Sequence, residues 1–199
     1  GRRSRAGTRS GAPPTAFAVK QELLVRNEVA RLAQETRFSK AEIETLLEQW
    51  GGAVDGQITK EQFAAGLAEI GVDDELVVEQ QFAAFDDDRS GTVDFREYIR
   101  AMSVLKHGTQ EERLELIFKS YDLDGSGTLD RDEVYAIYRT ALLYNGDNVD
   151  AAHDTILQEV DAVFAQCDAD GDGAIDFDEF KQGVEKNAIL AQCFIECPI

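Results

Sequence analysis

The chain has 199 residues, of which 43% are hydrophobic and 30% are charged, and its formal net charge at pH 7 is −19. No apolar run approaches the roughly 18 residues that a membrane-spanning helix needs, so we expect a soluble protein with a buried core. The strong negative charge argues against nucleic acid as a partner for the acidic body. Three cysteines are an odd number, which favours a reducing, cytoplasmic compartment over a disulfide framework.

The N-terminal segment 1–15 is rich in Arg, Ser, Gly and Pro and contains no acidic residue. Such a composition cannot bury enough apolar surface to offset the entropy lost on ordering, so we predict a disordered basic tail. A plain flexible tail is the favoured interpretation. An organelle transit peptide and a basic arm that touches a polyanion are the alternatives.

Residues 17–34 are predicted to form an amphipathic helix. Val25, Val29 and Leu32 follow the i, i+4, i+7 spacing of one helix face, and polar residues stand on the other side. The two leucines that precede Val25 fall outside this stripe. We therefore expect one apolar face, with those two leucines away from it.

Two capping boxes mark the starts of the next two helices. Ser39–Glu42 and Thr59–Gln62 each begin with a hydroxyl residue and end with Glu or Gln. In this pattern the hydroxyl and the carboxylate or amide satisfy each other's backbone N–H groups at a helix start. The first helix is expected to run to Trp50.

Between these helices, residues 51–62 have the frame of a calcium-binding loop without its ligands. Gly56 stands at position 6 and Ile58 at position 8, but Asp55 is the one carboxylate at a ligand position. A single carboxylate cannot offset the dehydration of a divalent ion, so we predict a metal-free loop. Its expected role is structural, with Ile58 paired to Val93 of the next loop.

Three further segments, 86–97, 122–133 and 168–179, carry oxygen ligands at the positions of a calcium-binding loop. Short side chains stand at positions 1, 3 and 5, a glycine at position 6 permits the sharp turn, and a Glu at position 12 can bind bidentately. This spacing suits Ca²⁺, and Asp at position 9 of each loop would allow Mg²⁺ to compete. The expected ligands of the three Ca²⁺ sites, with position 7 acting through its carbonyl, are Asp86, Asp88, Ser90, Thr92 and Glu97; Asp122, Asp124, Ser126, Thr128 and Glu133; and Asp168, Asp170, Asp172, Ala174 and Glu179.

The four loops form an internal repeat. They begin at positions 51, 86, 122 and 168, so successive units are separated by 35, 36 and 46 residues. We predict an all-α fold of four helix-loop-helix units in two paired lobes, with an N-terminal helix and a C-terminal helix. The expected domains are the tail at 1–15, an N-terminal pair at 16–105 and a C-terminal pair at 106–199.

The loops resemble those of the EF-hand family. Three complete loops behind a degenerate first one, in a chain of this length, resemble the neuronal calcium sensor superfamily. Segments 101–109 and 111–114 are similar to the linker between the halves in that superfamily, and segments 71–76 and 190–194 are similar to a ciliary branch that regulates dynein. The first loop departs from the family because it lacks the Cys-Pro pair that many members carry.

The resemblance implies a calcium sensor that presents an apolar groove to a dedicated protein target when Ca²⁺ binds. It also implies an axonemal dynein complex as the candidate target and the cilium as the candidate location. Met102 is the one methionine, so the groove is expected to accept a narrow range of partners. A constitutive regulatory subunit of a larger enzyme and a Ca²⁺ buffer are the alternatives. The candidate residues of the groove, for which a place in the core is the alternative, are Trp50, Phe63, Phe82, Phe85 and Tyr98.

We expect no enzymatic activity. His107 and His153 are isolated in the sequence, and no spacing suggests a nucleophile beside a base. The loop carboxylates would be occupied by metal.

The C-terminal residues 187–199 are predicted to form a helix with a broad apolar face, because Leu190 and Phe194 stand one helical turn apart. Such a helix would either pack permanently into the C-terminal half or lie in the groove until a target displaces it. The sequence leaves both possibilities open.

Overall fold

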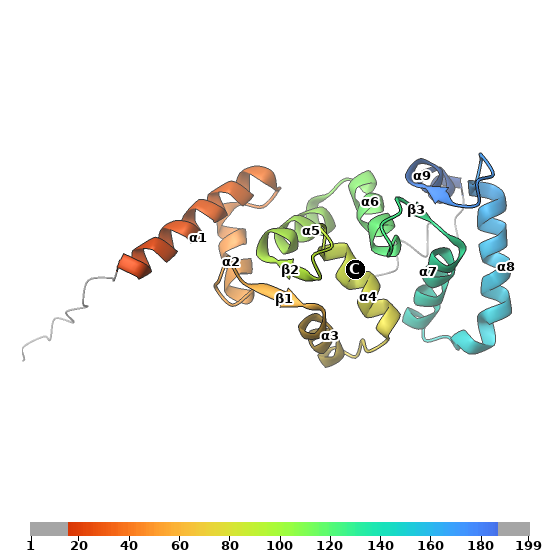
Figure 1. The fold of residues 1–199 in the computed structure, drawn as a ribbon, viewed down its shortest axis with the longest axis horizontal. Coiled ribbons are helices and arrows are strands. Elements are labelled where there is room, and N and C mark those ends of the chain that lie inside the picture. Colours follow the sequence, from red (N-terminus) through yellow and green to blue (C-terminus); the bar gives the residue numbers. More distant parts are fainter. Residues whose placement is uncertain (1–15, 187–199) are drawn as a thin grey trace, which may run out of the picture.

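The structure, a computed structural model, describes residues 16–186, so the predicted basic tail and the predicted C-terminal helix both lie outside the described residues. Figure 1 shows the elements in chain order. They are α1 (Ala16–Glu35), α2 (Lys40–Gln49), β1 (Gln57–Thr59), α3 (Lys60–Glu69), α4 (Glu75–Phe85), β2 (Thr92–Asp94), α5 (Phe95–His107), α6 (Gln110–Tyr121), β3 (Thr128–Leu129), α7 (Arg131–Tyr144), α8 (Val149–Cys167), β4 (Ile175–Asp176) and α9 (Phe177–Lys186).

Four helix-loop-helix units follow α1, and they confirm the all-α fold. The units join α2 to α3, α4 to α5, α6 to α7 and α8 to α9. Both predicted capping boxes are formed, at the starts of α2 and α3. The first of these helices ends one residue early, because Trp50 is its C-cap.

Short antiparallel strands join the units in pairs. β1 lies against β2 with Ile58 opposite Val93, as predicted, and β3 lies against β4 with Leu129 opposite Ile175. The first unit is therefore joined to the second, here called the N-terminal pair, and the third to the fourth, the C-terminal pair. The domain limits given above stay predictions.

Helix α1 packs along α2 and extends away from the rest of the molecule (Figure 1). Its predicted stripe faces the core, with Val29 and Leu32 exposing 2% and 0% of their surface and Val25 half-buried. Leu23 and Leu24, the leucines outside the stripe, are 53% and 48% exposed. The helix therefore contributes one face to the core and leaves apolar side chains on the other.

The buried side chains of the two pairs form distinct clusters, and Leu116 of α6 packs against one cluster of the N-terminal pair. The N-terminal pair holds two clusters of buried side chains, and Trp50, Tyr98 and Met102 pack against both. The C-terminal pair holds a single cluster. Among the helices that the structure describes, none combines the length with the hydropathy that a membrane crossing demands. Principal core residues are Leu32, Ile43, Phe95 and Ile99, then Phe82, Phe85 and Val93, and in the C-terminal pair Phe118, Leu129, Ile137, Ile156 and Phe180.

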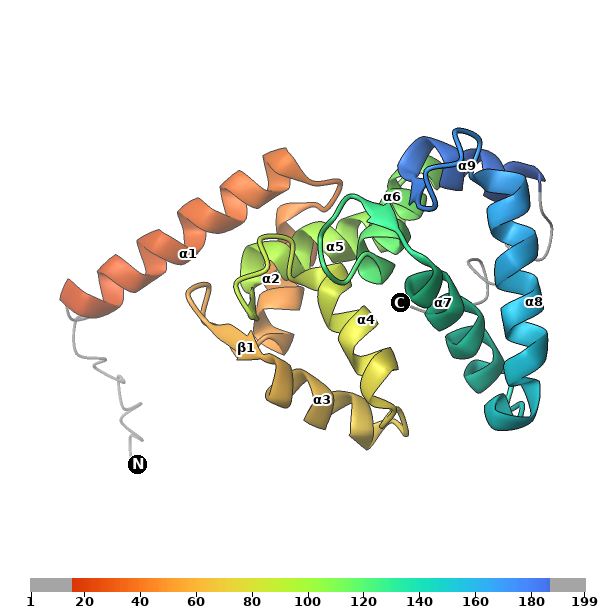
Figure 2. The ribbon, with the colours of Figure 1, turned by 45° about the vertical axis from the view of Figure 1, so that its right-hand side comes forward.

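Helix α4 forms the junction between the pairs, because it contacts both α6 and α7 (Figure 2). Arg139 of α7 donates two hydrogen bonds to the Asp74 carboxylate, at 2.9 and 2.7 Å. Nearby, the buried Thr140 hydroxyl donates to the Gln80 side-chain carbonyl at 2.8 Å. Polar contacts of this kind fix the register of the two helices as well as their proximity.

The ion pair at this junction predicts a pH-dependent stability. The hydrogen bond from Arg139 lowers the pKa of the Asp74 carboxyl below its ordinary value. A carboxylate with a lowered pKa stabilises the fold above its unfolded pKa of about 4, and this contribution is lost as the pH falls through the lower folded pKa. Asp74 is also the N-cap of α4, a role that Asn can keep. We expect Asp74→Asn to reduce the free energy of unfolding by about 1 kcal/mol at pH 7.

Denaturant unfolding at two pH values checks this prediction. The difference between Asp74→Asn and the unaltered chain should shrink as the pH falls through the lowered folded-state pKa of Asp74, and should vanish below it, where the carboxyl is protonated in both states. A difference of equal size at both pH values would contradict the assignment of the effect to the ion pair.

Candidate calcium sites

The loops at 86–97 and 122–133 bring carboxylates together as the sequence predicts. Asp86, Asp88 and Glu97 each offer one oxygen, and these three oxygens lie within 4.8 Å of one another. Asp122, Asp124 and Glu133 form the same arrangement in the other loop. Within each loop, the predicted ligands at positions 1, 3 and 12 therefore converge on one point.

Each position-12 glutamate closes its loop because it belongs to the first turn of the following helix. Glu97 accepts hydrogen bonds from the amides of Asp88, at 3.3 Å, and Asp94, at 2.8 Å. Glu133 accepts from the amides of Leu123, at 2.9 Å, and Asp130, at 3.0 Å. The second amide in each case belongs to the N-cap residue, so a capping box aims the glutamate back toward the start of the loop.

Both glutamates are 9% exposed, and burial raises the pKa of each carboxyl above its ordinary value. The neighbouring aspartates raise it further, since like charges oppose ionisation. A bound divalent cation would reverse both effects by favouring the charged forms. Buried carboxylates that repel one another are the arrangement expected of a cation-binding site.

The serines at position 5 extend the oxygen cluster to position 7. The Ser90 amide donates to one carboxylate oxygen of Asp86 and one of Asp88, at 2.9 and 3.0 Å. The Ser90 hydroxyl donates to the Thr92 carbonyl at 2.9 Å, and Ser126 makes the equivalent bond to Thr128. The predicted hydroxyl and carbonyl ligands thus lie next to each other in both loops.

The last loop is arranged differently. Oxygens of Asp168, Asp170 and Asp172 lie within 4.8 Å of one another, but Glu179 does not belong to this group. Its carboxylate accepts hydrogen bonds from the amides of Ala169 and Asp176, at 2.8 and 3.1 Å. The sequence did not predict this difference, because the position-12 residue is the same in all three loops.

The first loop has no comparable cluster within the described part of the chain. Asp55 is its one carboxylate at a ligand position. The following residues of the loop form β1, which pairs with β2. Gly56 has backbone and indole neighbours, because a Cβ there would lie 3.1 Å from the Ala53 carbonyl oxygen and 3.3 Å from Trp50 Nε1. These contacts support a structural role, and the absence of metal stays a prediction.

The donor sets consist of oxygen alone, which suits the hard cations Ca²⁺ and Mg²⁺ and does not suit zinc. Carboxylate count then predicts an order of filling. Loop 168–179 has five carboxylates at ligand positions and the other two have four each, so we expect it to fill at the lowest free Ca²⁺. A site-resolved NMR titration measures this order directly. The first changes appearing in loop 86–97 would contradict it.

Comparison with known proteins agrees with the geometry. The model of an EF-hand domain pair matches residues 111–185, and a single EF-hand model matches residues 78–103. A recoverin family protein of Dictyostelium discoideum is 30% identical over 145 residues, covering 68% of this chain and 64% of the relative. Guanylyl cyclase-activating protein 1 of Lithobates pipiens is 36% identical over 95 residues, with 47% and 46% coverage. Calaxin of Xenopus laevis is 30% identical over 115 residues, with 53% and 55% coverage.

The matched segments span between about half and two thirds of the length of these relatives. The two EF-hand models match the single unit around loop 86–97 and the pair that holds loops 122–133 and 168–179. The chain belongs to the EF-hand calcium sensors of the recoverin and neuronal calcium sensor family.

Proposed function

We propose that this chain binds three Ca²⁺ ions, in competition with Mg²⁺ at rest, and responds by exposing an apolar groove to a dedicated protein target. The observation that carries this proposal is the position of the ligands of loop 86–97 in the sequence. Asp86 directly follows Phe85, and Glu97 directly precedes Tyr98. A change in the loop is therefore transmitted to these two aromatic rings by adjacent backbone.

The rings belong to an aromatic cluster, which we define as Trp50, Phe63, Phe82, Phe85 and Tyr98. The rings of Phe85 and Tyr98 are stacked with their centroids 6.0 Å apart, and the ring centroids of Trp50 and Tyr98 are 4.9 Å apart. Phe63 contacts Phe82 and Phe85 at 5.5 and 5.8 Å. The residues expected to line a groove are thus packed against one another in this structure, with Phe82 and Phe85 only 5% and 8% exposed.

Helices α3, α4 and α5 supply four of these rings, and α4 and α5 are the helices that flank loop 86–97. Coordination of a cation by Asp86 and Glu97 would change how the end of α4 sits relative to the start of α5. The stacked pair spans that joint, so the change would separate the rings and open the cluster. In sensor EF-hands, this kind of helix reorientation is what exposes a groove.

Aromatic rings in place of methionines favour a narrow choice of target, because Met-rich surfaces repack more readily around different partners. One of the relatives is named for a target, a guanylyl cyclase, and calaxin is another of the relatives. We propose a cytoplasmic sensor with an axonemal dynein complex as a candidate target. The resemblance of segment 71–76 to the ciliary branch supports this choice.

An apolar fluorescent dye and a pull-down test the proposal together. We expect dye binding to rise on addition of Ca²⁺, and the target to be retained in Ca²⁺ and released by a chelator. Retention that is unaffected by chelator would favour a constitutive regulatory subunit. Dye binding that does not change, with no retained target, would favour a buffer.

One observation favours the constitutive alternative. Leu23 and Leu24 on α1 are exposed and lie outside the core that the calcium loops control. A target that grips these leucines would remain bound without Ca²⁺. Replacing both by Ser distinguishes the two modes, because it should weaken only retention that survives the chelator.

A further inference from the structure

Loop 86–97 contains a residue whose backbone conformation is unusual for its type. At position 4 the three acidic loops hold Arg89, Gly125 and Gly171, with φ of 56°, 74° and 77°. Glycine adopts this left-handed conformation freely, whereas a residue with a Cβ does so at a cost. Among the described residues other than glycine, Arg89 alone has a positive φ. Such an outlier indicates that the side chain has a role that offsets the strain.

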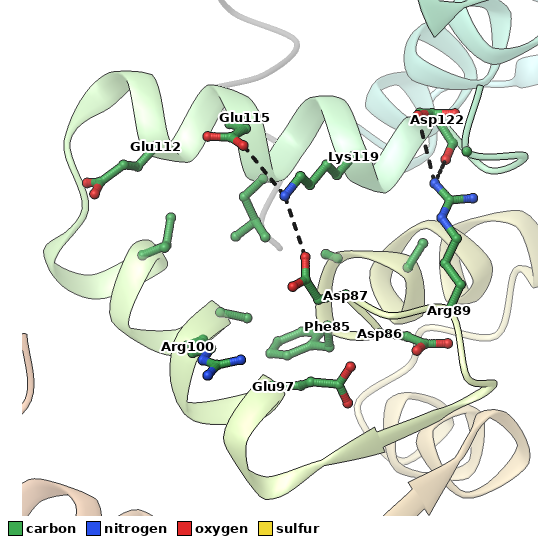
Figure 3. A pocket seen from close by; sticks show the side chains of 16 residues that line it. Phe85, Asp86, Asp87, Arg89, Glu97, Arg100, Glu112, Glu115, Lys119 and Asp122 are labelled. Atoms are coloured by element: carbon green, nitrogen blue, oxygen red, sulfur yellow. Dashed lines mark hydrogen bonds and ion pairs between the residues drawn. The ribbon is translucent and has the colours of Figure 1, made fainter. Parts of the chain in front are cut away.

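The Arg89 side chain reaches the next acidic loop, as Figure 3 shows. Its Nη2 donates to the Asp122 carbonyl at 2.6 Å, and its Nη1 donates to the Leu123 carbonyl at 2.8 Å. Nη2 also lies 3.8 Å from Oδ2 of the Asp122 carboxylate. The guanidinium thus holds the backbone of positions 1 and 2 in loop 122–133 and faces the carboxylate expected to be its first ligand.

The receiving loop is shaped to admit this side chain. A Cβ at Gly125 would lie 2.6 Å from Arg89 Cζ and 2.7 Å from its Nη1, so a side chain there would displace the guanidinium from this position. Arg89 and Gly125 both line a cavity of about 450 Å³ between the loops and helix α6. A second and longer contact crosses the same gap, from Lys119 of α6 to the Asp87 carboxylate at 3.5 Å.

This link is distinct from the strand pairing. The strands join loop 86–97 to the first loop, and loop 122–133 to the last, so neither strand pair crosses between the N-terminal and C-terminal pairs. Arg89 crosses that boundary from one calcium loop to another. Its backbone lies between Asp88 and Ser90, two predicted ligands, so coordination in loop 86–97 would fix the base of the arginine side chain.

We propose that Arg89 is a positioning residue that makes Ca²⁺ binding at loops 86–97 and 122–133 mutually favourable across the boundary between the pairs. Occupancy of loop 86–97 holds the guanidinium on the carbonyls of Asp122 and Leu123. Loop 122–133 then loses less conformational entropy when its own ion binds, which raises its affinity. By linkage, occupancy of loop 122–133 raises the Ca²⁺ affinity of loop 86–97 by the same factor. The proposal rests on the proposed function only in requiring that both loops bind Ca²⁺.

The positive charge of Arg89 also repels a cation at the Asp122 carboxylate. This repulsion is present whether or not loop 86–97 is occupied. The proposal is therefore tested by a cycle of variants, in which this constant effect cancels. Arg89→Lys keeps the charge but replaces the planar fork, so it cannot donate to both carbonyls in the same geometry. Glu97→Gln empties loop 86–97 by removing the bidentate charge.

The affinity of loop 122–133 is followed by NMR through the amide of Gly127, which donates to Asp122 Oδ2 at 3.0 Å. In the Arg89 background, we expect Glu97→Gln to weaken Ca²⁺ binding at this loop about fivefold. In the Arg89→Lys background, Glu97→Gln should leave the midpoint unchanged within error. Lys119→Ala is the matched control, since it removes a charge from the same gap and should retain the fivefold effect.

A second readout needs no ion in loop 122–133. In a Glu133→Gln variant that retains Arg89, Ca²⁺ binding to loop 86–97 should shift the amide signals of Asp124 and Gly125. When Arg89→Lys is added to that variant, the same signals should not shift. Coupling that survives Arg89→Lys, or is absent in the Arg89 background, would overturn the proposal. Failure of the Gly127 signal to respond to Ca²⁺ in any variant would instead contradict the calcium site itself.

Discussion

Glu97→Gln is expected to lower the Ca²⁺ affinity of loop 86–97 on the order of 100-fold or more. Substitution of groups that merely support a metal ligand already costs about 10–100-fold, and Glu97 is expected to supply two ligand oxygens. Gln has the same shape but carries no charge, so the fold should be preserved. The variant should also lose most of the Ca²⁺-dependent opening of the aromatic cluster, since the ring of Tyr98 follows residue 97.

Trp50 provides a built-in probe for this experiment. It is the only tryptophan in the chain, and it packs on Tyr98 within the cluster. Its emission should change on Ca²⁺ addition in the unaltered chain and respond weakly in Glu97→Gln. Glu69→Gln, an exposed carboxylate at the end of α3, is the control and should behave like the unaltered chain. A full Trp50 response in Glu97→Gln would contradict the proposed route from loop to cluster.

Phe95→Ala is expected to reduce the free energy of unfolding by about 3–5 kcal/mol, the usual cost of truncating a buried aromatic ring. Phe95 is 0% exposed, and its ring lies 6.0 Å from that of Trp50. It is also the first residue of α5, between Asp94 and Glu97. The cavity would therefore weaken the core of the N-terminal pair next to a calcium loop.

Denaturant unfolding without Ca²⁺ measures this loss free of any contribution from metal binding. Leu24→Ala is the control, because Leu24 is 48% exposed and its truncation should change the free energy of unfolding by less than about 0.5 kcal/mol. A loss below about 1 kcal/mol for Phe95→Ala would contradict the position of its ring in a close-packed core.

Some features of the fold were predictable because each depends either on residues close together in the sequence or, as for Ile58 and Val93, on equivalent positions of two adjacent repeats. The apolar stripe of α1, the capping boxes at Ser39 and Thr59, and the pairing of Ile58 with Val93 all agree with the structure. The convergence of carboxylates in the three loops follows from a twelve-residue spacing in the same way. Which of those oxygens bind metal stays a prediction.

Contacts between the pairs were not predictable from periodicity. Nothing in the spacing places Asp74 opposite Arg139, or Arg89 against Gly125, since these partners come from different repeats. Gly108 is a residue whose type reflects the placement of the two pairs. A Cβ there would lie 2.3 Å from the Val104 carbonyl oxygen, so the turn between α5 and α6, and with it the placement of the C-terminal pair, requires glycine.

The aromatic cluster shows a different limit. Its members were predicted as lining for a groove or as core, and the structure packs them together. A sequence specifies which side chains are apolar, but the same side chains serve as core in one conformation and as a binding surface in another. Under the proposed function, the state of the loops decides between the two.

Titration calorimetry of the metal-free chain with Ca²⁺ tests the central claim most directly. The account predicts three bound ions per chain, and two in each of the variants Glu97→Gln, Glu133→Gln and Glu179→Gln. Asp55→Asn, in the first loop, should leave the number at three. A fourth ion of comparable affinity that disappears in Asp55→Asn, or fewer than three ions in the unaltered chain, would contradict the account.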